Sequence, residues 1–229
     1  MGIISVEHGD RLFWLGRYVE WSFTTLKAVE IHFDKMIDKS HQACSEFIEA
    51  FGLVGNWGTA DAFLQSFIFD KVNTNSVAHS LESAYDNVIM LREEISTEAM
   101  SFIQIAMDNL EKNKDVSQGI AYKMLPLEDI LFGFWGCIED YVYDEETKNI
   151  IKCGKFVERL DLYFRLSYPE KDIIREFGRL CKCLSEVPKN TPYRYNTASL
   201  SVLVEIIGSD NILKQTSQAL SALSKLFEG

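Results

Sequence analysis

The chain has 229 residues, of which 47% are hydrophobic and 25% are charged, and this composition excludes a disordered or collagen-like chain. Only 4 prolines and 13 glycines are present, so few positions could separate domains, and we expect a single domain over residues 1–229. Lys and Arg number 23 against 34 Asp and Glu, and the net charge of −11 repels phosphate backbones and anionic lipid. We therefore expect neither nucleic acid nor a membrane as a partner.

The N-terminus has neither a basic start nor a sustained apolar stretch, so we expect no secretory signal. The longest apolar run, Ile130–Ile138, is much shorter than the roughly 20 residues that cross a bilayer. A cytoplasmic protein is the prediction. The cysteines are odd in number and lie in apolar helical patterns, which favours reduced thiols over disulfides. They are Cys44, Cys137, Cys153, Cys181 and Cys183.

Helical periodicity dominates the sequence and predicts an all-α, multi-helix bundle of about nine or ten helices. The first helix is expected over Val6–Ile37, where apolar residues recur every seven positions. Thr59 is placed to cap a short helix that follows it. A third helical stretch covers Val77–Ile95, and Ser96 or Thr97 can then cap the next helix.

The middle of the chain contains its most apolar helix. This helix is predicted over Leu127–Val142. Pro126 directly precedes it, and this marks the helix start, because proline is favoured near the beginning of a helix. Its aromatic residues Phe132, Phe134 and Trp135 are expected at the centre of the bundle.

Further helices are predicted towards the C-terminus. One helix ends before Ser167, which has the spacing of a capping box with Glu170. The next helix extends to about Val187, and 188–195 is predicted to be a loop. Two helices separated at Gly208 follow within residues 196–229.

Residues 12–27 and 150–165 are similar to each other at an offset of 138, which pairs Gly16 with Gly154 and Glu20 with Glu158. In each copy the glycine lies four residues before the glutamate, so both share one helix face. The glycine allows another helix to approach closely beside the carboxylate. The pattern suggests an internal duplication, and chance similarity between amphipathic helices is the alternative.

The chain resembles the alpha-E family of bacterial helical domains, which is named for its helical content and its Glu-Arg motif. Asp10–Glu20 is similar to the family's opening helix, and Gly154–Asp161 is similar to its later Glu-Arg helix. Asn75–Ser96 is a weaker match to the family's middle signature. The three segments span residues 10–166, and residues 196–229 match only loosely.

The chain departs from the family pattern at three positions. Trp21 replaces the arginine of the first Glu-Arg motif, and Tyr85 and Ile89 stand where the middle signature has arginines. A cluster in this chain therefore has fewer cationic side chains than the family pattern provides.

The resemblance implies an all-helical domain with no established activity of its own. Family members tend to occur beside, or fused to, circularly permuted ATP-grasp amide ligases and transglutaminase-like peptidases. The resemblance thus implies a non-catalytic accessory role in peptide synthesis or modification, with such a protein as partner. A homo-oligomer is a further alternative.

A cluster of acidic and basic residues is the candidate site. A carboxylate in apolar surroundings must find a cation or a proton, and we expect Glu20, Arg92 and Glu158 to approach one another. The cluster would bind a polar or peptide-like ligand, as a small-molecule binder or an enzyme. Alternatively it would fix the helix register in a purely structural interaction bundle. Its residues are Arg17, Glu20, Asp86, Arg92, Glu158 and Arg159.

Other chemistry has little support in the sequence. A phosphate-binding Gly-rich loop, a Gly-x-Ser-x-Gly elbow, a His-Glu-x-x-His motif and a Cys-x-x-Cys motif are all absent, which argues against a self-contained enzyme. No histidine follows a glutamate by three positions, as a bundle di-iron site requires. We predict no cofactor and no metal.

Overall fold

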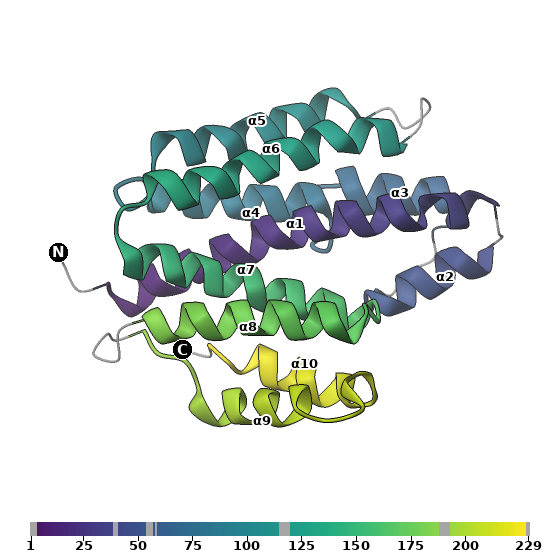
Figure 1. The fold of residues 1–229 in the computed structure, drawn as a ribbon. Coiled ribbons are helices and arrows are strands. Elements are labelled where there is room, and N and C mark those ends of the chain that lie inside the picture. The colour runs from purple at the N-terminus through teal and green to yellow at the C-terminus, as the bar shows by residue number, and fades with distance from the viewer. Residues whose placement is uncertain are drawn as a thin grey trace. The chain divides into compact units, whose positions relative to one another are not determined.

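The structure, a computed structural model, describes residues 4–38, 41–53, 57, 59–114, 120–187 and 193–227, with the side chains of 33–38, 41–44 and 120–123 excepted. Within these ranges it contains ten α-helices, one short 3-10 helix and no strand (Figure 1). The predicted all-α fold is confirmed. The elements are α1 (Val6–Asp38), α2 (His41–Ala50), α3 (Ala60–Phe69), α4 (Val77–Met90), α5 (Thr97–Lys112), α6 (Ile120–Tyr141), α7 (Glu145–Arg165), α8 (Glu170–Glu186), α9 (Thr197–Ile207), η2 (Ile212–Gln215) and α10 (Thr216–Ser224).

The chain forms two compact units. Unit 1 consists of residues 1–20 and 144–229, and unit 2 consists of residues 21–143. The boundary falls inside α1, which supplies Val6–Glu20 to unit 1 and Trp21–Asp38 to unit 2. That residues 1–229 act as one domain stays a prediction. Among the described helices, none combines the length and apolar character that a membrane span requires.

Polar caps begin α3, α4 and α5 of unit 2, and the caps at Thr59 and Ser96 are those that the sequence predicts. The hydroxyl of Thr59 accepts from the Ala62 N–H at the start of α3. Ser76 and Ser96 cap α4 and α5 in the same way. Each cap satisfies a backbone donor that has no partner within its helix.

An aromatic cluster forms part of the core of unit 2. Phe47 from α2 and Phe51 directly after it meet Phe63 and Phe67 from α3. The rings of Phe63 and Phe67 stack with centroids 5.1 Å apart. Trp21 of α1 packs edge-on against Phe67 at 5.7 Å. These rings anchor α2 and α3 to the second half of α1.

Two expectations for α6 are wrong. Pro126 lies inside the helix, which begins at Ile120, because a proline removes only its own N–H from the hydrogen-bond ladder and the neighbouring turns can continue. Phe132 is not central but 70% exposed, whereas Phe134 and Trp135 are buried. α6 packs with one face only, and Phe132 projects from the other.

The turn between α7 and α8 in unit 1 is built from backbone hydrogen bonds rather than the predicted capping box. Ser167 takes a φ of 51°, and its N–H and that of Tyr168 donate to the carbonyls of Phe164 and Tyr163. This is a Schellman motif that ends α7. Because Ser167 occupies its left-handed position, α8 instead begins after Pro169 without a side-chain cap.

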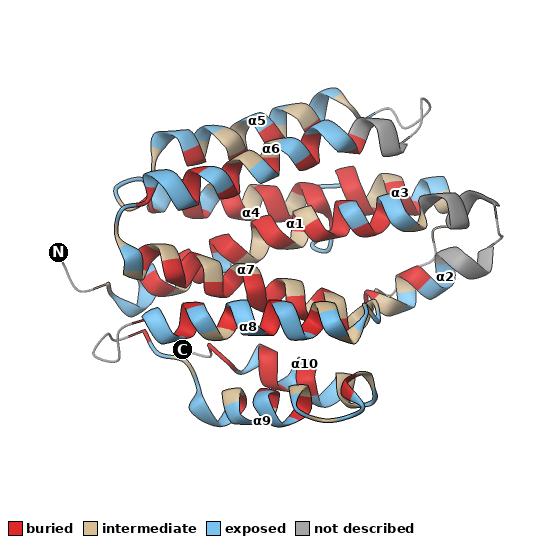
Figure 2. Cartoon of the chain, viewed as in Figure 1, coloured by how far each residue is buried: buried red, intermediate tan, exposed pale blue. Residues whose placement is uncertain are grey.

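The C-terminal helices complete unit 1. Asn196 caps α9 through its side chain, and its N–H donates to the Leu226 carbonyl at 2.8 Å. The ring of Phe227 packs against Phe13 of α1 at 4.6 Å and stacks on Tyr193. Buried residues follow one side of α8 and of α10 (Figure 2). Of the predicted loop 188–195, residues 188–192 lie outside the described residues, and 193–195 are non-helical.

The described cysteines are thiols that form no disulfide. Cys137, Cys153 and Cys183 are buried, and Cys181 is partly buried. Burial raises the pKa of Cys153 well above its ordinary value, so this thiol remains protonated and behaves as an apolar core residue. The side chain of Cys44 lies outside the described residues.

The net charge is divided unequally between the units. Unit 2 holds 8 of the 23 basic and 19 of the 34 acidic residues, which gives it a net charge of −11. Unit 1 holds 15 basic and 15 acidic residues and has no net charge. The acidity of the whole chain is therefore a property of unit 2.

Candidate functional site

The candidate site in unit 1 begins where α1 crosses α7. A Cβ added to Gly16 would lie 2.0 Å from the Ile151 carbonyl oxygen, and one added to Gly154 would lie 2.0 Å from that of Phe13. Residues 13 and 151 are equivalent at the offset of 138 that relates the two similar segments. The two helix backbones therefore touch reciprocally, and only glycine allows this approach. The close helix approach predicted at each glycine is found, and the structure shows that the approaching helix is the one that contains the other glycine.

Two buried ion pairs follow this crossing on its C-terminal side. The Arg17 Nε donates to Glu158 Oε2 at 2.6 Å, and the Arg159 Nε donates to Glu20 Oε1 at 2.6 Å. The side chains of Glu20 and Glu158 are 0% and 7% exposed. α1 thus provides Arg17 to the glutamate of α7, and α7 provides Arg159 to the glutamate of α1. The guanidinium of Arg17 also lies over the Trp14 ring, 4.7 Å from its centroid.

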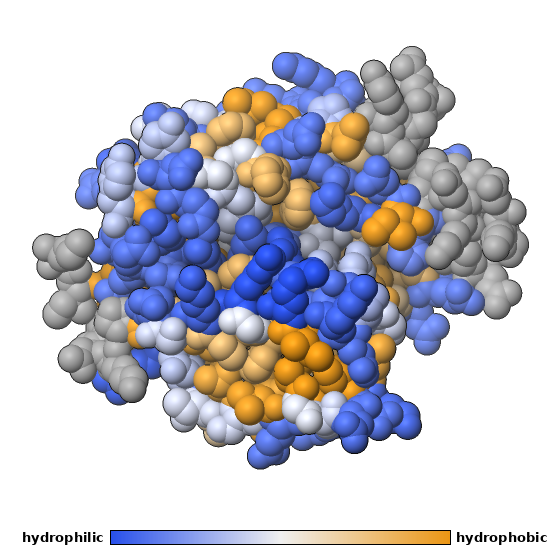
Figure 3. All heavy atoms as spheres, viewed as in Figure 1, coloured by the Kyte–Doolittle hydropathy of each residue, from blue (hydrophilic) through white to orange (hydrophobic). Residues whose placement is uncertain are grey.

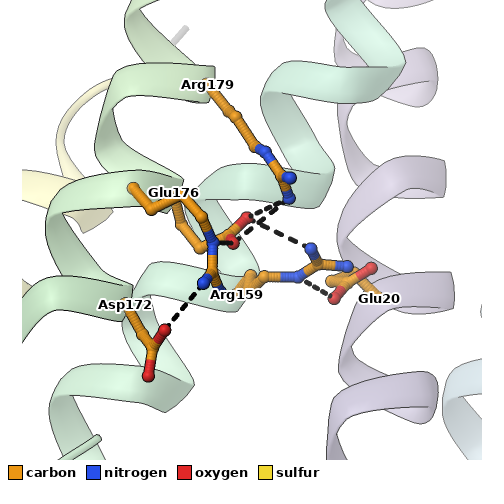
Figure 4. A network of polar contacts seen from close by, with 6 residues as sticks. Glu20, Arg159, Asp172, Glu176 and Arg179 are labelled. Atoms are coloured by element: carbon orange, nitrogen blue, oxygen red, sulfur yellow. Dashed lines mark hydrogen bonds and ion pairs between the residues drawn. The ribbon is translucent and has the colours of Figure 1, made fainter. Parts of the chain in front are cut away.

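α8 extends this arrangement through Glu176 (Figure 4). Arg159 Nη1 donates to Glu176 Oε2 at 3.1 Å, so one guanidinium bridges two carboxylates. Arg175 Nε and Arg179 Nη1 also donate to Glu176, at 2.9 and 3.2 Å. Asp172 accepts from Arg175 at 2.7 Å. We call these residues, with Arg17 and Glu158, the Glu-Arg network.

The surroundings shift the pKa values of two glutamates in opposite directions. Burial raises the pKa of Glu158 above its ordinary value, and the Arg17 guanidinium offsets this only in part. Burial also acts on Glu176, but the hydrogen bond from Arg175 and the charges of Arg159 and Arg179 outweigh it, so the pKa of Glu176 lies below its ordinary value. The nearby Asp161 carboxylate adds to the effect of burial on Glu158, whereas three arginines oppose burial at Glu176.

The structure brings four of the six predicted residues together, namely Arg17, Glu20, Glu158 and Arg159. The other two, Asp86 and Arg92, belong to unit 2, where both are exposed. Their approach to Glu20 and Glu158 stays a prediction.

Glu176, Arg175 and Arg179 are not among the residues predicted from the sequence. Glu176 lies on the buried face of α8, between Ile173 and Leu180. A glutamate at an apolar helical position needs a partner, and this pattern could have identified it.

Arg17 takes the place of the arginine missing at Trp21. Trp21 corresponds to Arg159 at the offset of 138. Since Arg159 pairs with Glu20, an arginine at position 21 would correspond to a partner of Glu158, and Arg17 pairs with that glutamate instead. Trp21 itself packs against Phe67 in unit 2. Of the other two departures, Tyr85 is partly exposed and Ile89 is 43% exposed.

The arrangement is suited to holding helices together. Each carboxylate of the network accepts a hydrogen bond from at least one arginine, and arginine does not lose its proton in proteins. In the described part of the chain, no group of three or more His, Cys, Asp or Glu residues could hold a metal ion.

The comparisons with known proteins identify one relationship. The sequence model of the Alpha-E family, described as a predicted alpha-helical domain with a conserved ER motif, matches residues 7–171. Glu158-Arg159 is the only Glu-Arg dipeptide in the sequence. No curated protein and no solved structure matches the chain. Because the match covers most of the sequence, the chain belongs to the Alpha-E family.

Proposed function

We propose that this protein is a cytoplasmic, non-catalytic helical partner of an ATP-grasp amide ligase or a transglutaminase-like protein, and acts in peptide synthesis or modification. The setting in which alpha-E domains tend to occur supports the choice of partner. The observation that carries the non-catalytic part is the pairing of Glu20, Glu158 and Glu176 with arginines.

A general acid or base must reach the proton that it transfers. As whole residues, Glu20, Glu158 and Glu176 are at most 5% exposed, and all three are held by guanidinium groups from neighbouring helices. A substrate would have to displace these ion pairs before it could use the carboxylates. The raised pKa of Glu158 favours the alternative of a ligand-binding or catalytic cluster, but its burial already accounts for the shift.

The test has a binding step and an activity step. The tagged full-length chain is used as bait in its native lysate, and retained proteins and small molecules are identified by mass spectrometry. We expect an ATP-grasp ligase or a transglutaminase-like protein to be retained. The activity of the purified partner is then measured alone, with the wild-type chain and with Glu158→Gln.

A folded Glu158→Gln chain that stimulates the partner as well as wild type supports a non-catalytic role. Glu145→Gln is the matched control, since Glu145 is exposed and lies on the same helix. A loss of stimulation with Glu158→Gln alone would instead assign chemistry to the network. Retention of a small molecule and no protein would favour the ligand-binding alternative, and retention of neither would leave a structural bundle.

A further inference from the structure

A strip of exposed apolar side chains lies in unit 2 where the second half of α1 meets α6. The two helices are joined by an ion pair in which Lys27 Nζ lies 3.1 Å from Glu128 Oε2. Ile31 is one turn beyond Lys27, and Leu125 and Phe132 are one turn to either side of Glu128. These three side chains are 57%, 51% and 70% exposed. We call them the α1/α6 strip.

The surface around the strip is open. Hydrophobic side chains emerge between hydrophilic ones over α1 and α6 (Figure 3). One turn after Phe132, a Cβ added to Gly136 would meet no atom within 4 Å. Single exposed apolar residues are common on proteins, whereas apolar residues that gather in one patch with a polar rim mark interaction sites.

Glu128 places a carboxylate beneath the strip that Lys27 neutralises only in part. Glu128 is only 4% exposed, and its Oε1 has no hydrogen-bond partner in the described part of the chain. Burial raises the pKa of Glu128, and Lys27 does not fully offset this effect. A buried carboxylate without enough donors is energetically costly, so cationic side chains bound above the strip would stabilise its charge.

The charge around the strip selects the partner. Glu30 and Asp129 are both exposed, and both are close enough to raise the pKa of Glu128. Unit 2 as a whole carries a net charge of −11. This potential attracts a basic partner and repels an acidic one.

We propose that the α1/α6 strip binds a basic amphipathic helix of a partner protein. Its apolar side chains pack on Ile31, Leu125 and Phe132. Its Arg and Lys side chains lie against the negative charge of Glu30, Glu128 and Asp129. This inference goes beyond the proposed function, because it holds whether or not the partner is a ligase. It uses a surface separate from the Glu-Arg network.

The test uses the purified full chain and a synthetic peptide of about 18 residues, or five helical turns. The peptide is made of Leu, Lys and Arg, with leucines at positions that form one helix face. A second peptide has the same composition with the leucines scattered. We expect the amphipathic peptide to bind at least about tenfold more tightly than the scattered one by fluorescence anisotropy at ~150 mM salt.

Four variants locate the binding site. Phe132→Ser should weaken binding at least about tenfold, while Val72→Ser, at an 88% exposed position of the same unit, should leave it unchanged. Glu128→Gln should weaken binding several-fold. Glu111→Gln removes the same charge from an exposed position on α5 and should have little effect. Binding should also lower the pKa of the Glu128 carboxyl, measured by carbon NMR in the wild-type chain.

Three results would overturn the proposal. The two peptides could bind equally, which would show attraction by charge alone. Each substitution could also have the same effect as its matched control. Finally, sedimentation could show a wild-type dimer that Phe132→Ser dissociates, in which case a second copy of this chain covers the strip.

Discussion

At the scale of single residues, the pairing across the repeat is the main feature of the site. A Glu-Arg motif suggests that each glutamate is served by the arginine beside it, but neighbours in a helix point in different directions. In this protein Glu20 pairs with Arg159, and Glu158 pairs with Arg17. Each glutamate depends on an arginine from the other helix, so both pairs break if α1 and α7 separate.

Removing one arginine should therefore be costly. Arg17→Ala leaves Glu158 buried without its cation, and we expect it to lower the free energy of unfolding by about 3–5 kcal/mol. Adding Glu158→Gln to this variant should recover part of the loss. The measurement is urea denaturation near neutral pH. Arg11→Ala is the control, because the Arg11–Glu7 pair is exposed and is worth at most about 1 kcal/mol. Equal losses for the two arginines would contradict a buried network.

The lowered pKa of Glu176 predicts a pH dependence. Since this pKa lies below the ordinary value of 4.5, the ionised carboxylate stabilises the folded state at pH values above 4.5. The contribution is lost as the pH falls through the folded-state pKa. The stability difference between wild type and Glu176→Gln should thus be largest near neutral pH and shrink below pH 4.5. Unfolding curves at several pH values measure it, and a difference that grows towards acid would refute this assignment.

At the scale of elements, the crossing of α1 and α7 is set by two glycines. The atoms that a side chain would strike are backbone carbonyl oxygens, which cannot rotate away as a side chain can. The helices must separate if either glycine gains a Cβ, and the ion pairs that span the crossing would lengthen with them.

Alanine substitutions can test this crossing. Gly16→Ala and Gly154→Ala should each lower the free energy of unfolding by more than about 2 kcal/mol, because both force the backbones apart. Gly178→Ala on α8 is the matched control, since a Cβ there meets no atom within 4 Å. It should stabilise the protein by about 0.5–1 kcal/mol through helix propensity. Thermal unfolding of the three variants gives the ranking, and tolerance of alanine at position 16 or 154 would disprove the close contact.

At the scale of the whole molecule, the family match covers only part of unit 1, and the net charge is confined to unit 2. The family model ends at residue 171, within α8, whereas unit 1 continues through the packing of Phe227 on Phe13. The net charge of −11 resides in unit 2. Self-repulsion of this kind opposes compact folding and is screened by salt.

Salt should consequently affect the two units differently. Raising NaCl from about 20 to 300 mM should screen the repulsion in unit 2 and slow amide exchange in α4, α5 and α6. The amides of α7 and α8 should show little or no slowing, since unit 1 has no net charge to screen. Hydrogen exchange followed by mass spectrometry resolves these segments. Equal slowing throughout the chain would contradict a repulsion confined to unit 2.

Much of the fold could be predicted from local sequence. Thr59, Ser76 and Ser96 cap helices because a hydroxyl next to an apolar periodic run satisfies the first free N–H groups. A glycine four residues before a glutamate in both similar segments, at Gly16 and Gly154, predicts a close helix contact. The spacing of Ser167 and Glu170 matches a capping box, but Ser167 does not cap α8. Its backbone has the left-handed conformation that ends α7.

The sequence by itself determined the helical class and most helix starts. It also determined that Gly16 shares a helix face with Glu20, and Gly154 with Glu158. All of these depend on residues within one or two turns of one another. Only the tertiary structure decided that Arg159 serves both Glu20 and Glu176, that Phe132 faces outward and that Glu128 is buried beside exposed apolar residues. These outcomes depend on the rotation and spacing of helices far apart in the chain. Periodicity identifies the packed face of a helix, but it does not identify the helix that packs on it.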